Sequence, residues 1–354
     1  MKKYIAGTIF NKFTGVLSNT EKHRAVFVRY PTRLESMVFN PSKINVNKSH
    51  KYNAGQLNFK INLFTEIKLS LIDEKKDIIE GNRPDLIIHA IELFRSATKI
   101  KDCYSINLTK NIDIQHAGLG SSSNVISAVS FALNALYGFP IDSKNYVKYI
   151  AQNHVEESNE NGKVVLVQSL GGSAIAGFFN GSVQIISGYS SLIYSKDMED
   201  YYDVVFGVPK DFKKFKAENL MKKEIDNLNG FIETGEKYAE KIAYRLLHEI
   251  LPDLNDNKLD SAGSLIFDYR FRMNSIKNCS FVYPKMVDIA ESLKSLYLNK
   301  NSIILSISSV GPGFFSISKG NKNKEKIKEA MQKNNLSINC FKLFNNSAQF
   351  FYEK

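Results

Sequence analysis

The chain has 354 residues, 43% of them hydrophobic, so it is long enough to bury two hydrophobic cores. Its net charge of +11 comes from basic side chains that are scattered among polar and acidic ones, which argues against a nucleic-acid partner. The three cysteines lie far apart and give no disulfide framework, and no apolar run approaches the roughly 18 residues of a membrane span, so we expect a cytoplasmic protein with no membrane partner.

The first hundred residues predict strands followed by one helix. Residues 3–10 and 25–30 have the apolar pattern of strands, and residues 56–72 alternate apolar and polar side chains as a pair of longer strands would. Pro84 then begins an amphipathic helix that ends near Arg95. We therefore expect strands linked by polar turns, with the helix after them.

A glycine turn lies between an alternating run at residues 104–114 and a small-residue run at residues 125–137. Its sequence, QHAGLGSSSN at residues 115–124, places two glycines where the backbone turns and three serines on the first turn of a helix. Free backbone N–H groups and the positive end of the helix dipole would point at one spot, which is the geometry of an anion site. An ordinary glycine turn with a serine N-cap is the alternative. The pattern matches neither the Walker loop nor the dinucleotide fingerprint.

A second helix is predicted from Tyr146 to about Glu157, with Ser143 as its N-cap. It ends in the sequence NHVEE at residues 153–157. Glu156 in this sequence is either a carboxylate that binds a metal or part of an acidic helix end in solvent. The sequence alone leaves both interpretations open.

The rest of the chain predicts a second α+β region. Residues 178–194 alternate as two strands around Gly188, and residues 204–209 form a short buried strand that ends at a proline. We place the change of domain near residue 190, which gives domains 1–190 and 191–354. The elements predicted after it are a helical region at 217–250 with breaks near Gly230 and Gly235, helices at 259–274, 283–298 and 323–334, strands at 303–307 and 314–318, and a strand pair at 337–341 and 349–352.

GLGSSS at residues 118–123, at the start of an alanine-rich helix, resembles the second motif of the GHMP kinase superfamily, the group of galactokinase, homoserine kinase, mevalonate kinase and phosphomevalonate kinase. SSVGPGFF at residues 308–315 resembles the glycine-rich third motif, which packs against the phosphate loop in these proteins. Ile114 stands where the group usually has a proline. The resemblance implies a two-domain α+β fold of the GHMP kinase type, with an N-terminal domain like ribosomal protein S5 domain 2 and a ferredoxin-like C-terminal domain.

The same resemblance implies an ATP- and magnesium-dependent kinase that transfers the γ-phosphate to a hydroxyl of a sugar-like or other small metabolite. His154 and Glu156 are similar to the His-x-Glu of the sugar kinases, in which the glutamate reaches magnesium, so Glu156 and the Ser122 hydroxyl would hold the metal. The residues that would contact the nucleotide are Gly118, Leu119, Gly120, Ser121, Ser122, Ser123, Gly311 and Gly313.

The catalytic aspartate of many of these kinases has no counterpart in this sequence. Counting back from the turn at Asn180 and Gly181, its position falls on or beside Ser173, and residues 144–196 contain no aspartate. Homoserine kinase-like members work without this base, because transfer through a loose transition state depends mostly on positioning and electrostatics. The missing base suits a member that is no kinase equally well.

A second hypothesis rests on RYPTRLES at residues 29–36. This stretch resembles the N-terminal arginine motif of β-ribofuranosylaminobenzene 5'-phosphate synthase, a GHMP-fold transferase, although Glu35 stands where that family tends to carry histidine. Arg33 then becomes a candidate catalytic residue of an enzyme that uses a phosphorylated ribose donor, while a surface loop with two arginines is the plain alternative. A binding relative without chemistry is the third function. The expected partners are a nucleotide and a small-molecule substrate, with a homodimer left open.

Overall fold

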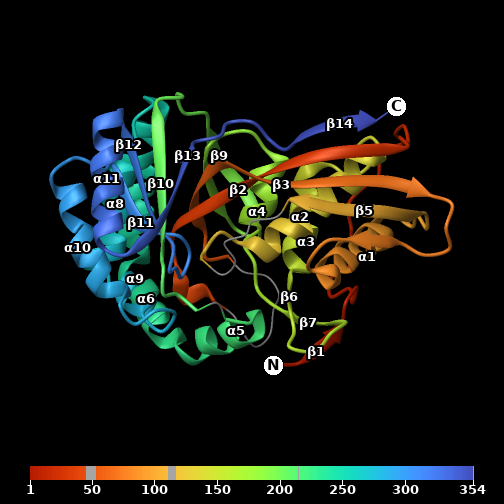
Figure 1. Cartoon of the computed structure of the whole chain (residues 1–354), viewed down its shortest axis with the longest axis horizontal. Helices are drawn as coiled ribbons and strands as arrows, with labels where there is room; N and C mark the ends of the chain where they lie inside the picture. Colours follow the sequence, from red (N-terminus) through yellow and green to blue (C-terminus); the bar gives the residue numbers. More distant parts are fainter. Residues whose placement is uncertain (45–52, 111–116, 214, 354) are drawn as a thin grey trace.

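The computed structural model describes residues 1–44, 53–110, 117–213 and 215–353. In this part of the chain two halves lie side by side, each with helices packed on its own sheet (Figure 1). The predicted α+β class is therefore confirmed. The end of the alternating run, Ile114, and the first two residues of the glycine stretch, Gln115 and His116, lie outside the described residues.

Two long strands, β2 (Ala25–Val38) and β3 (Gln56–Ile72), pair antiparallel at the centre of the first sheet. The surface loop considered for the stretch around Arg33 is wrong, because register shifts after Pro31 and after Glu35 let β2 continue through it. Residues 56–72 form one strand and not a pair, since no glycine or proline interrupts their alternation.

Strand β14 (Gln349–Glu353) follows the second half in sequence but pairs with β2 in the first sheet. The sheet order is β14-β2-β3-β5-β4, and β8 pairs with both β3 and β9. The predicted strand pair at 337–341 and 349–352 is wrong, because β13 (Leu336–Lys342) pairs with β10 in the second sheet. The other strands of the first sheet are β4 (Ile78–Glu80), β5 (Cys103–Lys110), β8 (Val183–Ser187) and β9 (Ser191–Lys196).

Helices α2 and α4 pack directly on β2 and β3, and α1 and α3 lie against α2. Every residue of α2 except Ser123 is buried, and small side chains such as Ala128 and Ala132 allow this close packing. The helix that follows the glycine turn is therefore fixed on all sides. The bounds are α1 (Pro84–Thr98), α2 (Ser121–Leu136), α3 (Ser143–Gln152) and α4 (Gly172–Phe178).

The second predicted helix ends five residues earlier than expected, at Gln152, and Glu156 lies on a strand. Asn153 terminates the helix: its Nδ2 donates to the Tyr149 carbonyl at 2.9 Å, and its Oδ1 accepts from the backbone N–H groups of Phe10 and Asn11 at 2.8 and 2.9 Å. The chain then enters a small antiparallel sheet of order β1-β7-β6. Its strands are β1 (Lys3–Ile5), β6 (Val155–Glu157) and β7 (Lys163–Leu166).

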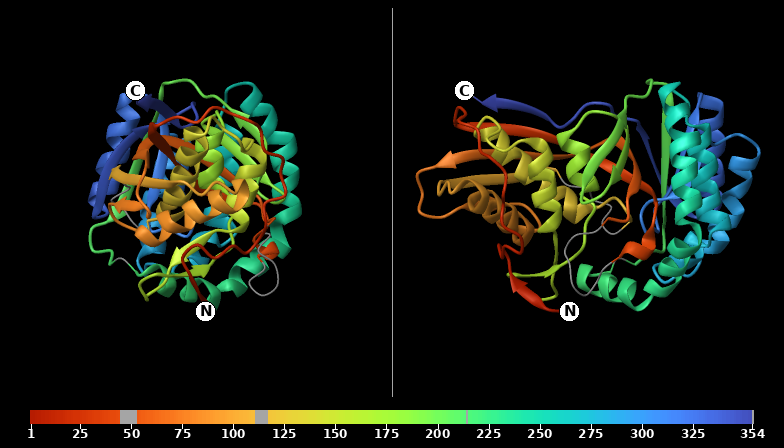
Figure 2. Two further views of the ribbon diagram at one scale, coloured as in Figure 1. Left: turned by 90° about the vertical axis from the view of Figure 1, so that its right-hand side faces the viewer. Right: turned by 180° about the vertical axis from the view of Figure 1, so that it is seen from behind.

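The second sheet has the order β11-β12-β10-β13, with antiparallel pairing throughout. Helices α10 and α11 lie on the side of this sheet that faces away from the first half (Figures 1 and 2). Its remaining strands are β10 (Tyr202–Pro209), β11 (Ile304–Ile307) and β12 (Phe314–Lys319). The helices are α5 (Ala217–Asp226), α6 (Leu228–Arg245), η2 (Leu246–Ile250), α7 (Leu251–Asn255), α8 (Asp260–Phe267), η3 (Asp268–Arg272), α9 (Ser275–Asn278), α10 (Met286–Leu298) and α11 (Asn321–Lys333).

The predicted helix breaks near Gly230 and Gly235 are wrong, since α6 runs through both glycines and the boundary with α5 falls at Asn227. Both glycines make room for neighbours instead. A Cβ on Gly235 would lie 2.2 Å from the backbone nitrogen of Ser42 in the short helix η1 (Pro41–Lys43), and one on Gly230 would lie 2.6 Å from the side-chain oxygen of Asn278.

Hydrophobic side chains from both halves share one buried cluster. Leu34 and Phe59 of the first sheet pack with Phe206 and Phe315 of the second, and the ring centroids of Phe59 and Phe315 are 6.3 Å apart. Each half also has a cluster of its own. The division into domains at residue 190 stays a prediction, because β14 and the shared cluster tie the two halves together.

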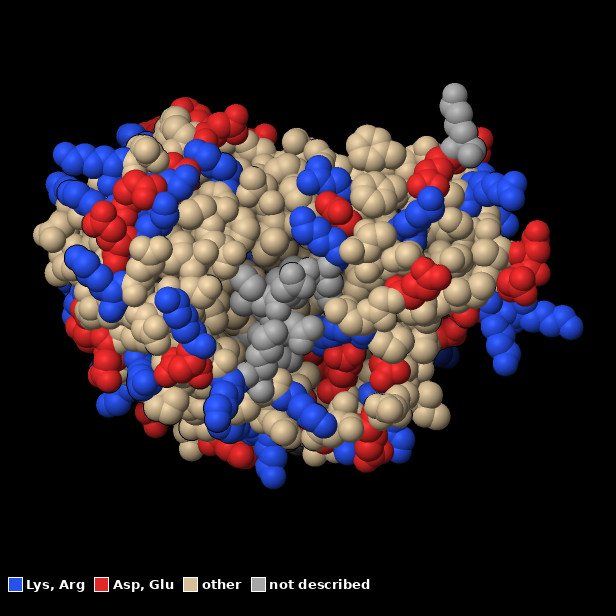
Figure 3. Space-filling view, in the orientation of Figure 1, with Lys and Arg blue, Asp and Glu red and all other residues tan. Residues whose placement is uncertain are grey.

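Charged side chains of both signs are interspersed on the face of the molecule shown in Figure 3. On α11 the lysine-rich run pairs within the helix, since Lys328 lies 2.8 Å from Glu325. Such exposed pairs contribute little to stability. Among the helices of the described ranges, none is long and apolar enough to cross a membrane.

Candidate functional site

The glycine turn before α2 lies directly against the second half. Gly118 and Gly120 have φ angles of +85° and +63°, which L side chains rarely adopt, and Gly120 is the N-cap of α2. A Cβ on Gly118 would lie 1.9 Å from the Ser308 carbonyl oxygen, and the Ser308 hydroxyl donates to the Gly118 carbonyl at 2.7 Å. The expected packing of the glycine-rich segment 308–315 against the loop is therefore confirmed.

Three of the predicted nucleotide contacts lie in different surroundings. Gly311 lines the cavity described below. Gly313 serves packing, because a Cβ on it would lie 2.3 Å from the Ala117 carbonyl oxygen. Leu119 is buried in the hydrophobic cluster that the two halves share, and its side chain does not line the cavity. Leu119 and Gly313 thus support the loop on the side that packs against the second half.

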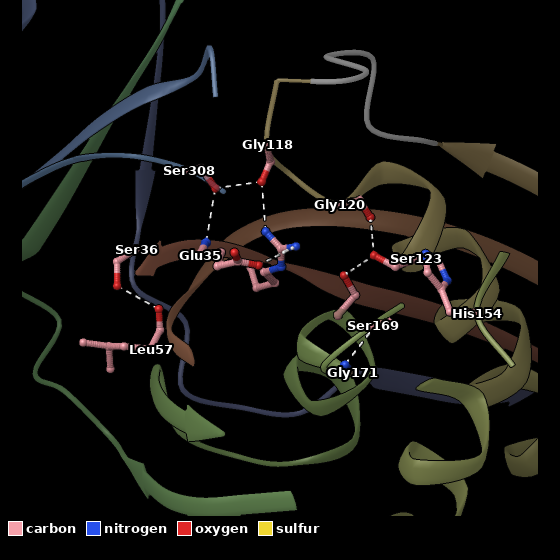
Figure 4. A network of polar contacts seen from close by, with 12 residues as sticks. Glu35, Ser36, Leu57, Gly118, Gly120, Ser123, His154, Ser169, Gly171 and Ser308 are labelled. Carbon is pink, nitrogen blue, oxygen red and sulfur yellow. Dashed lines mark hydrogen bonds and ion pairs between the residues drawn. The ribbon is translucent and has the colours of Figure 1, made fainter. Parts of the chain in front are cut away.

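Three polar side chains converge at Gly120. The Ser123 hydroxyl donates to the Gly120 carbonyl at 2.9 Å (Figure 4). The same hydroxyl lies 2.7 Å from the Ser173 hydroxyl. A Cβ on Gly120 would lie 2.9 Å from both hydroxyls and 3.1 Å from Nη2 of Arg33. Ser173, which is the position expected for the missing aspartate, therefore touches the glycine loop and lies beside an arginine.

Arg33 is a buried residue of β2 and not part of a surface loop. Its Nη1 donates to the Gly118 carbonyl at 2.9 Å, and its Nη2 lies 3.3 Å from the Glu35 carboxylate. Its Nε is buried and finds no hydrogen-bond partner in the described part of the chain. Burial lowers the pKa of the Arg33 guanidinium, and the Glu35 carboxylate opposes that shift. The strand thus places a charged group under the loop.

Glu156 lies on strand β6 and its side chain is only 15% exposed, which rules out the interpretation as a solvated helix end. One oxygen, Oε1, lies 3.7 Å from Nε2 of His154. The other, Oε2, is buried and accepts no hydrogen bond from the residues that the structure describes. Burial raises the pKa of the Glu156 carboxyl, but His154, Arg83 and Ser122 outweigh it, so this pKa lies below its ordinary value. Glu156 is therefore ionised at neutral pH.

Sequence reasoning missed Arg83, whose guanidinium joins the loop to β6. It donates to the Ser122 hydroxyl at 2.6 Å and to the Glu157 carboxylate at 2.7 Å. Its Nη2 lies 3.8 Å from Glu156. These partners are all at least 38 positions away in sequence, so no local pattern marks the arginine.

A cavity of about 270 Å³ lies between the two halves and takes walls from both, which is a common place for a ligand site. Sequence reasoning also missed Glu224, which enters the cavity wall from α5. Burial, together with the nearby carboxylates of Glu156 and Glu35, raises the pKa of Glu224 to about 8. The predicted site residues that line the cavity are Arg33, Gly118, Gly120, Ser121, Ser122, Ser123, Glu156, Ser173 and Gly311.

Ser122 and Glu156 present oxygen ligands of the kind that magnesium prefers. Oε2 of Glu156 accepts no hydrogen bond from the described residues, which leaves its lone pairs for a metal ion, and Ser122 lines the same cavity as Glu156. Within the described ranges, no group of three or more His, Cys, Asp and Glu residues could hold a metal ion. Magnesium therefore fits this pair only if water and a bound phosphate chain supply most of its ligands.

The family model described as the GHMP kinases N terminal domain matches residues 85–167. No curated protein sequence matches the chain. Among solved structures, homoserine kinase from Cytophaga hutchinsonii is 17% identical, with a TM-score of 0.63 over 96% of this chain and 100% of that one. Mevalonate pyrophosphate decarboxylase from Streptococcus pyogenes is 18% identical, with a TM-score of 0.63 over 92% and 99%.

A third structure, of mevalonate diphosphate decarboxylase from Enterococcus faecalis, is 11% identical, with a TM-score of 0.62 over 93% of this chain and 99% of that one. A fourth, at the same identity and coverage and with a TM-score of 0.63, holds MVAPP, AMPPCP and magnesium. At these identities the likeness is one of fold. The two-domain α+β fold expected from the two glycine motifs is therefore confirmed over nearly the whole chain.

Proposed function

We propose that this chain, which belongs to the GHMP kinase superfamily through the N-terminal domain matched at residues 85–167, is an ATP- and magnesium-dependent kinase for a hydroxyl of a small metabolite. The observation that carries the proposal is one cavity lined by the start of α2, by Ser122 with Glu156, and by Arg33 with Ser173. A helix start binds phosphates, an oxygen pair holds magnesium, and the remaining wall receives the acceptor.

The proposed reaction needs little covalent chemistry from the protein. The acceptor oxygen forms a bond to the γ-phosphorus while the bond from that phosphorus to the bridging oxygen breaks, so ADP leaves with the electron pair and the hydroxyl proton passes to the transferred group. Magnesium, when bound, neutralises charge on the β- and γ-oxygens. Backbone N–H groups at Gly120 and the serines hold the phosphates, while Arg33 and Ser173 would orient the acceptor.

The experiment measures ADP release from ATP across a panel of sugars, amino-acid alcohols and isoprenoid alcohols. At least one acceptor class should raise ADP release well above the rate without acceptor. Gly120→Val should abolish that signal, because a side chain there collides with Ser123 and Ser173. The matched control is Gly162→Val, since Gly162 also has a positive φ but no described atom lies within 4 Å of a Cβ there.

A phosphoribosyl-type transferase is the second candidate. Two observations favour it: Arg33 is buried at the cavity, and the position of the catalytic aspartate is taken by the neutral Ser173. Isothermal titration separates the two, because the kinase binds ATP and the transferase binds a phosphorylated ribose donor. Binding of either ligand without turnover of any substrate would indicate a relative that has kept the site and lost the chemistry.

A further inference from the structure

Arg83 has an unusual backbone for its residue type. It lies in the left-handed region, with φ +68° and ψ +46°, immediately before Pro84, the first residue of α1. This conformation is unfavourable for an L residue with a long side chain, and such outliers gather at functional sites. The side chain is only 5% exposed, so the strained backbone delivers a charged group into the interior.

One guanidinium contacts four side chains there. Nη1 and Nη2 donate to the hydroxyls of Ser121 and Ser122, at 3.3 and 2.6 Å. Nε donates to Glu157 at 2.7 Å, and Nη2 lies 3.8 Å from Oε2 of Glu156. Arg83 does not line the cavity, whereas Ser122 and Glu156 do, so it can act on a ligand only through these neighbours.

The two carboxylates of β6 are therefore not equivalent. Glu157 forms the close ion pair with Arg83 and lies outside the cavity wall, while Glu156 lines the cavity and its Oε2 accepts no hydrogen bond from the described residues. The Ser122 oxygen accepts from Arg83, which leaves its own proton and one lone pair for the cavity side. Arg83 is held closest by Glu157, so of the two carboxylates of β6 it is Glu156 that faces a cation in the cavity, with the Arg83 charge 3.8 Å away.

We infer that Arg83 is a positioning residue that keeps a divalent cation from binding at Ser122 and Glu156 until the donor phosphates bring it. A cation on Oε2 of Glu156 would lie within a few ångströms of the guanidinium, and like charges at that distance repel strongly in a buried site. A phosphate chain at the glycine loop adds the negative charge that reverses this balance. The naming of the donor as a nucleotide rests on the proposed function.

The test uses Mn²⁺ as the probe and follows free Mn²⁺ by electron paramagnetic resonance, without nucleotide. The unaltered protein should bind Mn²⁺ weakly. Arg83→Met removes the repelling charge and leaves both carboxylates of β6, so Mn²⁺ should bind about tenfold more tightly or better. Arg83→Lys keeps the charge and should behave as the unaltered protein does. Equal, weak binding in the methionine variant would overturn the inference.

A second variant protects the test if Arg83→Met does not fold. Glu157→Gln removes the partner of Arg83, which should then turn to Glu156 and weaken Mn²⁺ binding in the presence of ADP by roughly threefold or more. The control is Arg95→Met on α1, which breaks ion pairs with Asp77, before β4, and with Glu92, and should leave Mn²⁺ binding unchanged. Unchanged binding in Glu157→Gln would contradict the role of Arg83.

The two proposals fail in different ways. If Arg83→Met binds Mn²⁺ more tightly but the protein binds no nucleotide, the role of Arg83 is supported and the proposed kinase function is contradicted. If the protein binds nucleotide but Arg83→Met gains no Mn²⁺ affinity, the proposed kinase function stands and the role of Arg83 is contradicted.

Discussion

The glycine loop and strand β6 face the same cavity, but different forces hold them. The loop is fixed by close backbone contact with the second half. A Cβ on Gly118 would lie only 1.9 Å from the Ser308 carbonyl oxygen, so no larger residue fits there. Strand β6 pairs with β7, but its two carboxylates are held by charge, since Glu157 and Glu156 lie 2.7 and 3.8 Å from Arg83. We therefore expect changes in the loop to destroy shape, and changes in β6 to alter charge while shape persists.

The largest expected effect tests the loop. Gly120→Val should weaken ATP binding about 100-fold or more. The new side chain would collide with the Ser123 and Ser173 hydroxyls, so the backbone N–H groups of the loop could no longer be placed to bind phosphates. Isothermal titration measures the affinity for ATP. Thermal melting of Gly162→Val measures how much stability is lost when valine is placed at a positive φ without a collision. Intact ATP affinity in the Gly120 variant, with only the melting temperature lowered, would make the helix start purely structural.

The second prediction tests the charge in β6. Glu156→Gln keeps the shape of the side chain but removes the proposed metal ligand, so turnover should fall about 100-fold while the free energy of unfolding changes by about 1 kcal/mol or less. Steady-state kinetics and thermal melting measure the two quantities. Glu160→Gln is the control, since Glu160 lies on the surface and, among the residues that the structure describes, its carboxylate pairs with Lys3 and Lys163. A fully active Glu156 variant would remove this carboxylate from the proposed site.

A smaller effect is expected where the two regions meet, at Ser173. Because a serine hydroxyl does not titrate in the accessible range, Ser173→Ala should lower turnover only a few-fold, by about 1 kcal/mol of lost positioning, and leave the shape of the pH–rate profile unchanged. The profile is measured at saturating magnesium and donor. A limb that disappears in this variant, or a large gain of rate in Ser173→Asp, would show that a base acts at this position.

The smallest effect concerns stability and not turnover. The pKa of Glu224 is raised to about 8, so the folded protein holds this proton more tightly than the unfolded chain does. The tighter proton binding contributes to the free energy of unfolding. This contribution is fully present below the ordinary glutamate pKa and is lost as pH rises toward 8. Melting temperatures of the unaltered protein and Glu224→Gln should therefore diverge between pH 5 and 9, in favour of glutamine at high pH. Parallel curves would show that Glu224 is not buried among carboxylates.

The sequence was sufficient for the parts of the site that glycine encodes locally. Gly118, Gly120 and the three serines predicted the turn and the helix start, and both are present. The same reasoning failed at Asn153, because its partners Phe10 and Asn11 lie more than 140 positions away. Contacts of that range decide where α3 ends and hence where Glu156 lies.

Arg83 and Glu224 were missed for the same physical reason. Neither belongs to a motif, and each gains its meaning only from groups that the fold brings near: the loop serines and β6 for Arg83, and two distant carboxylates for Glu224. Arg33 lies between these cases. A short motif pointed to it, but only the bulges of β2 show that the stretch is a strand and that the guanidinium is buried.

The return of β14 to β2 has a consequence for synthesis on the ribosome. Every residue of the second sheet precedes β14 in sequence, so the edge of β2 stays without its partner strand while that sheet is translated. An open strand edge is a template for pairing with other chains. A nascent chain paused before Gln349 should therefore recruit holding chaperones that the released protein does not need, and a ribosome-stalled series of lengths would locate the residue at which they leave.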